Sequence, residues 1–163
     1  MAKIDNAKTI AHYTDLINTN PNDVNSYFDR GFAYGEMGDF NKAIADYSKV
    51  IILAPNDSDA YCNRGSAYTM KGKHNKAIAD YNKAVILDPK NATAYYNRGV
   101  SYGRTGKYKK ALSDFTRAIK LRPKYAKAYY NRGVMYEQRG EYIKAKNDFI
   151  MARWTGWNIC KIT

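Results

Sequence analysis

Four prolines recur in this chain at a constant step of 34 residues, at Pro21, Pro55, Pro89 and Pro123. Two sets of glycines keep the same step, and they are Gly31, Gly65, Gly99, Gly133 and Gly38, Gly72, Gly106, Gly140. Landmarks that stay in register over four copies indicate a tandem array of repeats, whose period constrains the architecture more than any single motif does. Such an array predicts that function lies on a shared surface rather than in a catalytic pocket.

The first half of each repeat has the pattern of a helix. In residues 24–57, Tyr27, Gly31 and Tyr34 stand at i, i+4 and i+7, which marks one face of a helix. Gly38 is expected to end this helix, because glycine readily adopts the left-handed conformation that a helix terminus needs.

The second half of the repeat predicts another helix. Asp39 or Asn41 can cap its first turn, and Pro55 stops it. Between these ends, Ala43, Tyr47 and Val50 again follow helical spacing. Each repeat is therefore expected to be a helical hairpin that is stabilised by stacking on its neighbours.

The repeat divides the whole chain. The predicted parts are an N-terminal half repeat with one helix at residues 1–23, full repeats at 24–57, 58–91 and 92–125, a degenerate fourth repeat at 126–159, and a C-terminal capping tail at 153–163. The fourth repeat counts as degenerate because Trp157 stands where the closing proline is expected.

The order of an aromatic residue, glycine, tyrosine, alanine, aromatic residue and proline over 34 residues resembles the tetratricopeptide repeat. The resemblance covers roughly residues 1–157. It implies an all-α fold, a right-handed α-solenoid of antiparallel helix pairs with nine helices or so.

The chain departs from the family pattern by an arginine in front of the first glycine of each repeat, where leucine is usual. The arginines are Arg30, Arg64, Arg98 and Arg132, and sixteen residues after each comes an aspartate, at Asp46, Asp80, Asp114 and Asp148. One interpretation is a ladder that binds phosphate. The favoured interpretation is a structural ion pair in every hairpin.

Residues one step round from the packing face differ between the repeats. The resemblance implies that they line a concave groove that holds peptides, while the alternative is that they widen the core. They are Phe28, Phe32, Cys62, Ser66, Tyr96, Val100, Tyr130 and Val134. Asn63, Asn97 and Asn131 are expected to face the same groove and to bond the peptide backbone.

In some members of the family, asparagines and basic residues clamp the C-terminal carboxylate of a chaperone tail. The residues that fit this pattern here are Asn63, Asn97 and Lys127. Asp59 stands where a lysine is wanted, and Asn131 replaces a second basic residue. A looser site for an acidic peptide, using Lys127 and Arg104, is therefore expected.

Residues suited to catalysis or metal binding are scarce in this sequence. His12 and His74 are its two histidines, and they cannot build a zinc site with two distant cysteines. No phosphate-binding loop or nucleophile motif is visible. We therefore expect no catalytic residues, no metal and no cofactor. The predicted function is a non-catalytic scaffold that binds a protein or peptide segment, acidic in character, as a monomer or weak homodimer.

The net charge of +12 offers a rival function, because the third repeat holds nine basic side chains and one acidic side chain. The residues concerned are Lys107, Lys109, Lys110, Arg117, Lys120, Arg122 and Lys124. Clustered cations bind phosphate by releasing counterions, so nucleic acid or an anionic surface is the alternative partner. We expect this patch to lie on the convex side, away from the groove and without interleaved aromatic residues, which favours a solvated face instead.

The last residues, RWTGWNICKIT, leave the repeat pattern. They contain Trp154, Trp157, Ile159 and Ile162, which predict either a cap over the last hairpin or a surface for self-assembly. We expect the cap, with Trp157 packed on the last hairpin. No apolar run of the roughly 20 residues that span a bilayer is visible, and no signal peptide, so the cytoplasm is the expected location.

Overall fold

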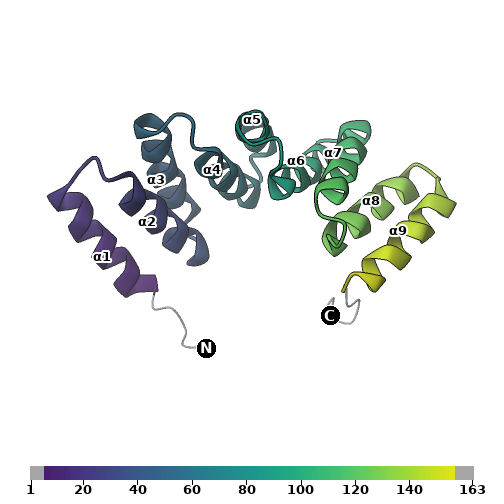
Figure 1. Cartoon of the computed structure of the whole chain (residues 1–163), viewed down its shortest axis with the longest axis horizontal. Coiled ribbons are helices and arrows are strands. Elements are labelled where there is room, and N and C mark those ends of the chain that lie inside the picture. Colours follow the sequence, from purple (N-terminus) through teal and green to yellow (C-terminus); the bar gives the residue numbers. More distant parts are fainter. Residues whose placement is uncertain (1–5, 157–163) are drawn as a thin grey trace. The chain divides into compact units, whose positions relative to one another are not determined.

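In a computed structural model that describes residues 6–156, the chain is built from helices paired in antiparallel hairpins (Figure 1). Within this range there are nine helices and no strand. They are α1 (Asn6–Thr19), α2 (Val24–Glu36), α3 (Phe40–Leu53), α4 (Ser58–Met70), α5 (His74–Leu87), α6 (Ala92–Arg104), α7 (Tyr108–Leu121), α8 (Ala126–Gln138) and α9 (Tyr142–Trp154). The predicted all-α class and its helix pairs are confirmed.

The chain divides into two compact units, Met1–Asp88 and Pro89–Thr163, which we call unit 1 and unit 2. Unit 1 holds α1 and the hairpins α2–α3 and α4–α5, and unit 2 holds the hairpins α6–α7 and α8–α9. Each unit thus contains two complete hairpins with the same internal packing. None of the described helices has the length and apolar character needed to cross a membrane.

The turn inside each hairpin depends on a glycine with positive φ, as the repeat predicts. Gly38 has φ of 80° and Gly106 has φ of 73°. After Gly38, the backbone N–H of Asp39 donates to the carbonyl of Tyr34, and the Asp39 side chain accepts from the backbone N–H of Lys42. The predicted cap by Asp39 is confirmed. In the later hairpins, Lys73, Lys107 and Glu141 take this place without a side-chain cap.

The two helices of a hairpin approach closely at the first glycine of each repeat. A Cβ atom added at Gly65 would lie 2.8 Å from a carbon of the Tyr81 ring, and one added at Gly99 would lie 2.8 Å from a carbon of the Phe115 ring. These distances are shorter than ordinary packing contacts, so glycine is required by space here and not by backbone conformation.

The repeated arginines and aspartates form buried ion pairs, as the sequence interpretation favoured. Arg30 donates from Nε and Nη2 to the two carboxylate oxygens of Asp46, both at 2.8 Å. The same two-pronged pairing joins Arg64 to Asp80, Arg98 to Asp114 and Arg132 to Asp148. Each of these guanidinium groups is therefore bound by a carboxylate of its own hairpin. The favoured interpretation, a structural ion pair, is the one that the structure supports over a phosphate-binding ladder.

The same arginines connect neighbouring hairpins. Arg64 on α4 donates from Nη1 to Ser48 on α3 at 3.0 Å, and Arg132 on α8 donates from Nη1 to Thr116 on α7 at 3.0 Å. Tyrosine rings also stack against them, because the Arg98 guanidinium carbon lies 5.3 Å from the ring centre of Tyr95. The tyrosines of the first helices thus pack against the arginines that connect neighbouring hairpins.

Candidate functional site

A pocket in unit 2 brings together four of the predicted site residues. It has a volume of about 240 Å³ and lies between the first helices of the two hairpins, α6 and α8, with α7 behind it. The predicted residues in its lining are Val100 and Arg104 of α6 and Asn131 and Val134 of α8. We call it the unit-2 pocket; Gly103, Tyr108, Phe115, Met135 and Gln138 complete the lining.

A second pocket, of about 280 Å³, occupies the equivalent place in unit 1, two repeats earlier. It lies between α2 and α4 with α3 behind it, and we call it the unit-1 pocket. Its lining is Phe32, Gly35, Glu36, Phe40, Ala43, Tyr47, Asn63, Ser66, Ala67 and Met70. Of the residues predicted for the groove it contains Phe32, Asn63 and Ser66. All of its residues except Ala43 correspond, 68 positions apart, to residues that line the unit-2 pocket.

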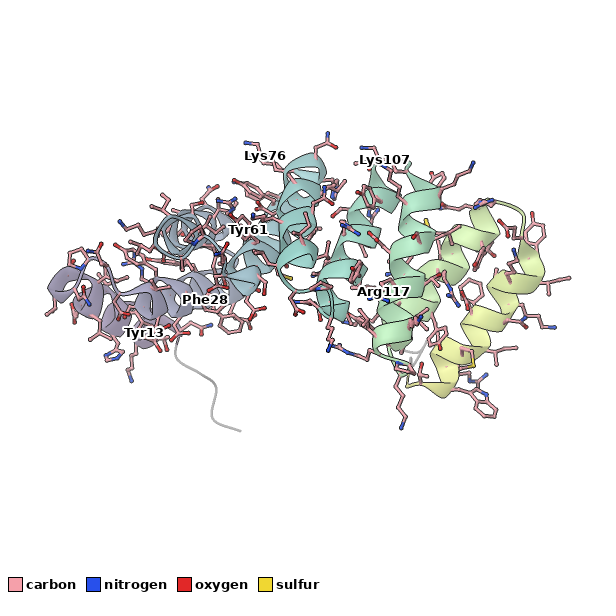
Figure 2. All side chains as sticks on the ribbon, turned by 45° about the horizontal axis from the view of Figure 1, so that its top comes forward. Tyr13, Phe28, Tyr61, Lys76, Lys107 and Arg117 are labelled. Atoms are coloured by element: carbon pink, nitrogen blue, oxygen red, sulfur yellow. The ribbon has the colours of Figure 1, made fainter. Side chains whose placement is uncertain are left out.

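Of the aromatic residues predicted for the groove, Phe32 lines the unit-1 pocket, whereas Phe28, Tyr96 and Tyr130 pack inside the hairpins. Phe28, which Figure 2 labels on α2, has its ring centre 5.6 Å from that of Tyr47. Tyr96 packs 5.8 Å from Phe115, and Tyr130 packs against Phe149 in the same way. Burial raises the pKa of Tyr96 to about 12. Phe28 and Tyr96 thus pack on pocket-lining residues, Tyr47 and Phe115, but neither they nor Tyr130 are in the two pocket linings.

Asn131 connects the packed aromatic layer to the unit-2 pocket. Its side-chain nitrogen donates to the hydroxyl of Tyr96 at 2.8 Å. This bond fixes the orientation of the amide, whose oxygen can accept one hydrogen bond more. An oxygen held in this way is suited to an N–H group of a ligand.

Three other predicted residues take no part in either pocket lining. Cys62 is only 7% exposed, and burial raises the pKa of its thiol to about 12, so it belongs to the core and not to a groove surface. Asn97 is half-buried on α6, and Lys127 is exposed in the first turn of α8. Neither lines the unit-2 pocket.

Several pocket residues escaped the sequence interpretation. Tyr108 and its counterpart Phe40 begin the second helix of their hairpins and form one wall. Gln138 ends α8 and its counterpart Met70 ends α4, and these two helices form the opposite walls of their pockets. These residues could have been predicted from the sequence, because they stand within a few residues of the turn glycines. A hairpin turn places the end of one helix and the start of the next at the same edge of the hairpin.

The basic residues of the third repeat are not free of aromatic partners, and this part of the sequence interpretation was wrong. The Lys110 ammonium lies 5.6 Å from the ring centre of Tyr102, and the Arg117 guanidinium lies 5.8 Å from that of Tyr95. Figure 2 labels Lys107, which directly precedes α7, and Arg117 on α7. The rings come from α6, so only the fold brings them beside the cations.

The described residues contain no group of three or more histidine, cysteine, aspartate or glutamate side chains that could hold a metal ion. The arrangement offers instead two small, open pockets, each lined by a mixture of apolar and polar residues that includes an asparagine and one charged side chain. Such surfaces hold a ligand by shape, hydrogen bonds and charge.

Comparison with protein families gave three matching models described as TPR repeat or tetratricopeptide repeat. They match residues 65–106, residues 24–57 and 92–125, and residues 47–79 and 115–147. Together these matches run without a gap from residue 24 to residue 147. The comparison with curated proteins gave no match.

Three solved structures illustrate the structural likeness. A crystal structure of MamA is 29% identical with a TM-score of 0.85, covering 90% of this chain and 85% of that one. The Arabidopsis OM64 TPR domain is 29% identical with a TM-score of 0.70, covering 71% and 95%. The first TPR of Spaghetti (RPAP3), bound to the HSP90 peptide SRMEEVD, is 26% identical with a TM-score of 0.71, covering 72% and 93%.

Proposed function

The chain belongs to the tetratricopeptide repeat family, and from this we propose that it is a protein-interaction scaffold that holds an acidic peptide segment in the unit-2 pocket. The proposed action is binding and not catalysis. The observation that carries the proposal is the exposed Arg104 in the wall of a pocket that is lined by apolar residues such as Val100 and Val134 together with polar ones such as Asn131.

Arg104 stands in a strongly positive surrounding. Unit 2 carries 17 basic and four acidic side chains. Two of the acids, Asp114 and Asp148, are buried in ion pairs, and Glu141 pairs with Arg139 and Lys144. The surface field therefore favours the approach of an anionic ligand.

Each part of the pocket has a suitable partner in an acidic peptide. The side chains of Val100 and Val134 can cover an apolar residue of the peptide, and Asn131 can accept from a peptide N–H. The Arg104 guanidinium can bind a carboxylate with two parallel hydrogen bonds. Lys127, although outside the lining, adds a positive charge on α8. The peptide in the RPAP3 complex, SRMEEVD, carries three acidic residues and one basic residue, which supports this chemistry.

A charge reversal tests the proposal. The probe is a fluorescent peptide in which leucine alternates with glutamate, hereafter the acidic probe, and its binding is followed by anisotropy. Arg104→Glu is expected to weaken binding about tenfold or more, because it replaces an attraction at the contact by a repulsion.

The matched control is Lys120→Glu, which makes the same change of net charge on the exposed side of α7, outside the pocket lining. It is expected to change the affinity less than Arg104→Glu does. Equal losses in both variants would mean that the general positive field of unit 2 binds the probe, and the pocket assignment would be wrong.

Binding of nucleic acid or an anionic surface is the second candidate, favoured by the cations of α7 that lie over tyrosine rings. Phosphate binding weakens steeply with salt, with a slope that follows the number of contacts. A salt titration with mixed RNA and DNA distinguishes the candidates. No binding at low salt would remove this one, and binding that resists Arg104→Glu but not Lys120→Glu would favour it.

A further inference from the structure

We infer that the unit-1 pocket is a second binding site with the opposite charge preference, which takes a peptide segment whose apolar side chain is flanked by lysine or arginine. The inference rests on the proposed scaffold function but concerns a different pocket and a different ligand chemistry. It is carried by the position-by-position correspondence of the two pockets.

The charged positions of the two pockets are inverted between the units. Glu36 occupies in α2 the place that Arg104 occupies in α6, and each lines its pocket. Asp59 occupies in α4 the place that Lys127 occupies in α8. The asparagine of the pocket, in contrast, is the same in both, at Asn63 and Asn131. The two pockets therefore share equivalent lining positions, but the charged side chains at and near them are acidic in unit 1 and basic in unit 2.

Basic side chains on the pocket-forming helices do not cancel these acids. The basic residues within α2 and α4 are Arg30 and Arg64, and both are bound by the carboxylates of Asp46 and Asp80. On α3, Lys42 pairs with Asp39 at 3.0 Å, and the Lys49 ammonium lies 5.9 Å from the ring centre of Tyr27. Glu36 and Asp59 are both exposed. Unit 1 as a whole has ten basic and eleven acidic side chains, so its field does not repel a cation as that of unit 2 does.

The apolar lining of the unit-1 pocket also differs in shape. Ser66 and Ala67 take the places of Val134 and Met135, which leaves the α4 side less filled. At the rim, Phe32 is 53% and Met70 65% exposed. A pocket with small residues inside and large apolar residues at its edge fits an inserted apolar side chain. The carboxylate of Glu36 in the lining can then bind a cation beside it, and Asp59, one turn before Asn63 on α4, adds a negative charge outside the lining.

The test uses the full chain and a fluorescent peptide in which leucine alternates with lysine, hereafter the basic probe. We expect it to bind the wild-type chain, and Glu36→Arg to weaken that binding about tenfold. The matched control is Asp15→Lys, which makes a similar change of charge at an exposed position of α1, outside the pocket lining. This control is expected to leave the affinity within about twofold.

The double variant Glu36→Arg with Asp59→Lys gives the unit-1 pocket the charges of unit 2. We expect it to lose the basic probe and to bind a second acidic probe per chain in a calorimetric titration. Far-ultraviolet circular dichroism checks that the variant is folded. Basic-probe binding that survives in the folded double variant overturns the inference.

The outcomes separate this inference from the proposed function. Acidic-probe binding that depends on Arg104, together with no basic-probe binding, overturns the inference and leaves the proposed function standing. Basic-probe binding that depends on Glu36, without an Arg104-dependent acidic site, supports the inference and contradicts the unit-2 proposal. If sedimentation shows self-association of the wild type that the double variant abolishes, the occupant is a second copy of the chain, and the assignment to a separate peptide fails.

Discussion

Units 1 and 2 contain the same hairpin packing but carry very different charge. Unit 1 has ten basic and eleven acidic side chains, whereas unit 2 has 17 and four. The buried ion pairs, the close-approach glycines and the turn glycines are the same in both. This difference indicates that the repeat constrains the residues that are packed between helices. The exposed positions of the same helices can vary, and they can give each unit a different ligand preference.

The largest expected effect concerns what the units share. Asp114→Ala would leave the mostly buried guanidinium of Arg98 without its carboxylate, at a cost of about 3 kcal/mol in the free energy of unfolding. Asp80→Ala should cost unit 1 a similar amount through Arg64. Urea denaturation followed by circular dichroism measures both.

The control for this prediction replaces both partners. Arg98→Met with Asp114→Leu should recover much of the loss, since an apolar pair of similar volume leaves no unpaired charge. If the single aspartate variants unfold at the wild-type urea concentration, the ion pairs are not structural, and the packing shared by the two units needs another explanation.

A somewhat smaller effect is expected at the close-approach glycines. Gly65→Ala and Gly99→Ala should each destabilise the chain by about 2 kcal/mol, because the added Cβ meets an aromatic ring at 2.8 Å. Gly35→Ala, where nothing lies within 4 Å, should instead stabilise it by about 0.5–1 kcal/mol. Thermal unfolding of the three variants tests this, and a loss of stability at Gly35 would contradict it.

A difference between the units is expected at the end of unit 2. Trp154 is 82% exposed at the end of α9, and Ile150 next to it is partly exposed. Trp157, which the sequence analysis expects to cover this hairpin, lies outside the described residues, so the cap stays a prediction. Deleting residues 154–163 should cost about 1–2 kcal/mol through lost apolar burial and promote association.

Calorimetry and light scattering measure both consequences of this deletion. A full-length chain that is a tight dimer, together with a deleted chain that is a stable monomer, would make the tail an oligomerisation element. Self-assembly would then replace the cap.

The smallest effect is expected at the hydrogen bond between Tyr96 and Asn131. Tyr96→Phe should cost about 1 kcal/mol at neutral pH, because it removes the acceptor of Asn131. The pKa of Tyr96 is raised to about 12 from an ordinary value of 10.0, so its contribution is complete below pH 10 and is lost as the pH rises to about 12.

The variant should therefore lose less stability between pH 10 and pH 12 than the wild type does. Urea midpoints measured over this range check the prediction. Equal alkaline losses in the two proteins would show that Tyr96 ionises no later in the folded chain than in the unfolded one.

Much of the fold could be predicted because its signals are local or strictly periodic. Gly38 and Asp39 mark a turn and a cap within a few residues of one another. The partners Arg30 and Asp46 could be matched because their spacing recurs in every repeat. A pair of positions that recurs in four repeats of one chain indicates a contact, just as a pair that recurs among homologous sequences would.

The site was predicted less well, because a helical period does not say how deep a side chain lies. Tyr96 and Val100 stand one turn apart on α6, yet Tyr96 packs on Phe115 and Val100 lines the pocket. Tyr108 was missed because its place in the pocket depends on α7 folding back beside α6. Pocket membership is a property of three helices, while the sequence pattern describes one helix at a time.

Sequence alone was sufficient for the helices, their turns, the ion-pair partners and the unequal charge of the two halves, since each depends on residue type and spacing. Tertiary structure decided which exposed residues meet. It placed Glu36 and Arg104 in equivalent pockets and moved Cys62 into the core. The reason is physical: hydrogen bonding and periodicity act along the chain, whereas burial and pocket shape arise only where separate helices pack together.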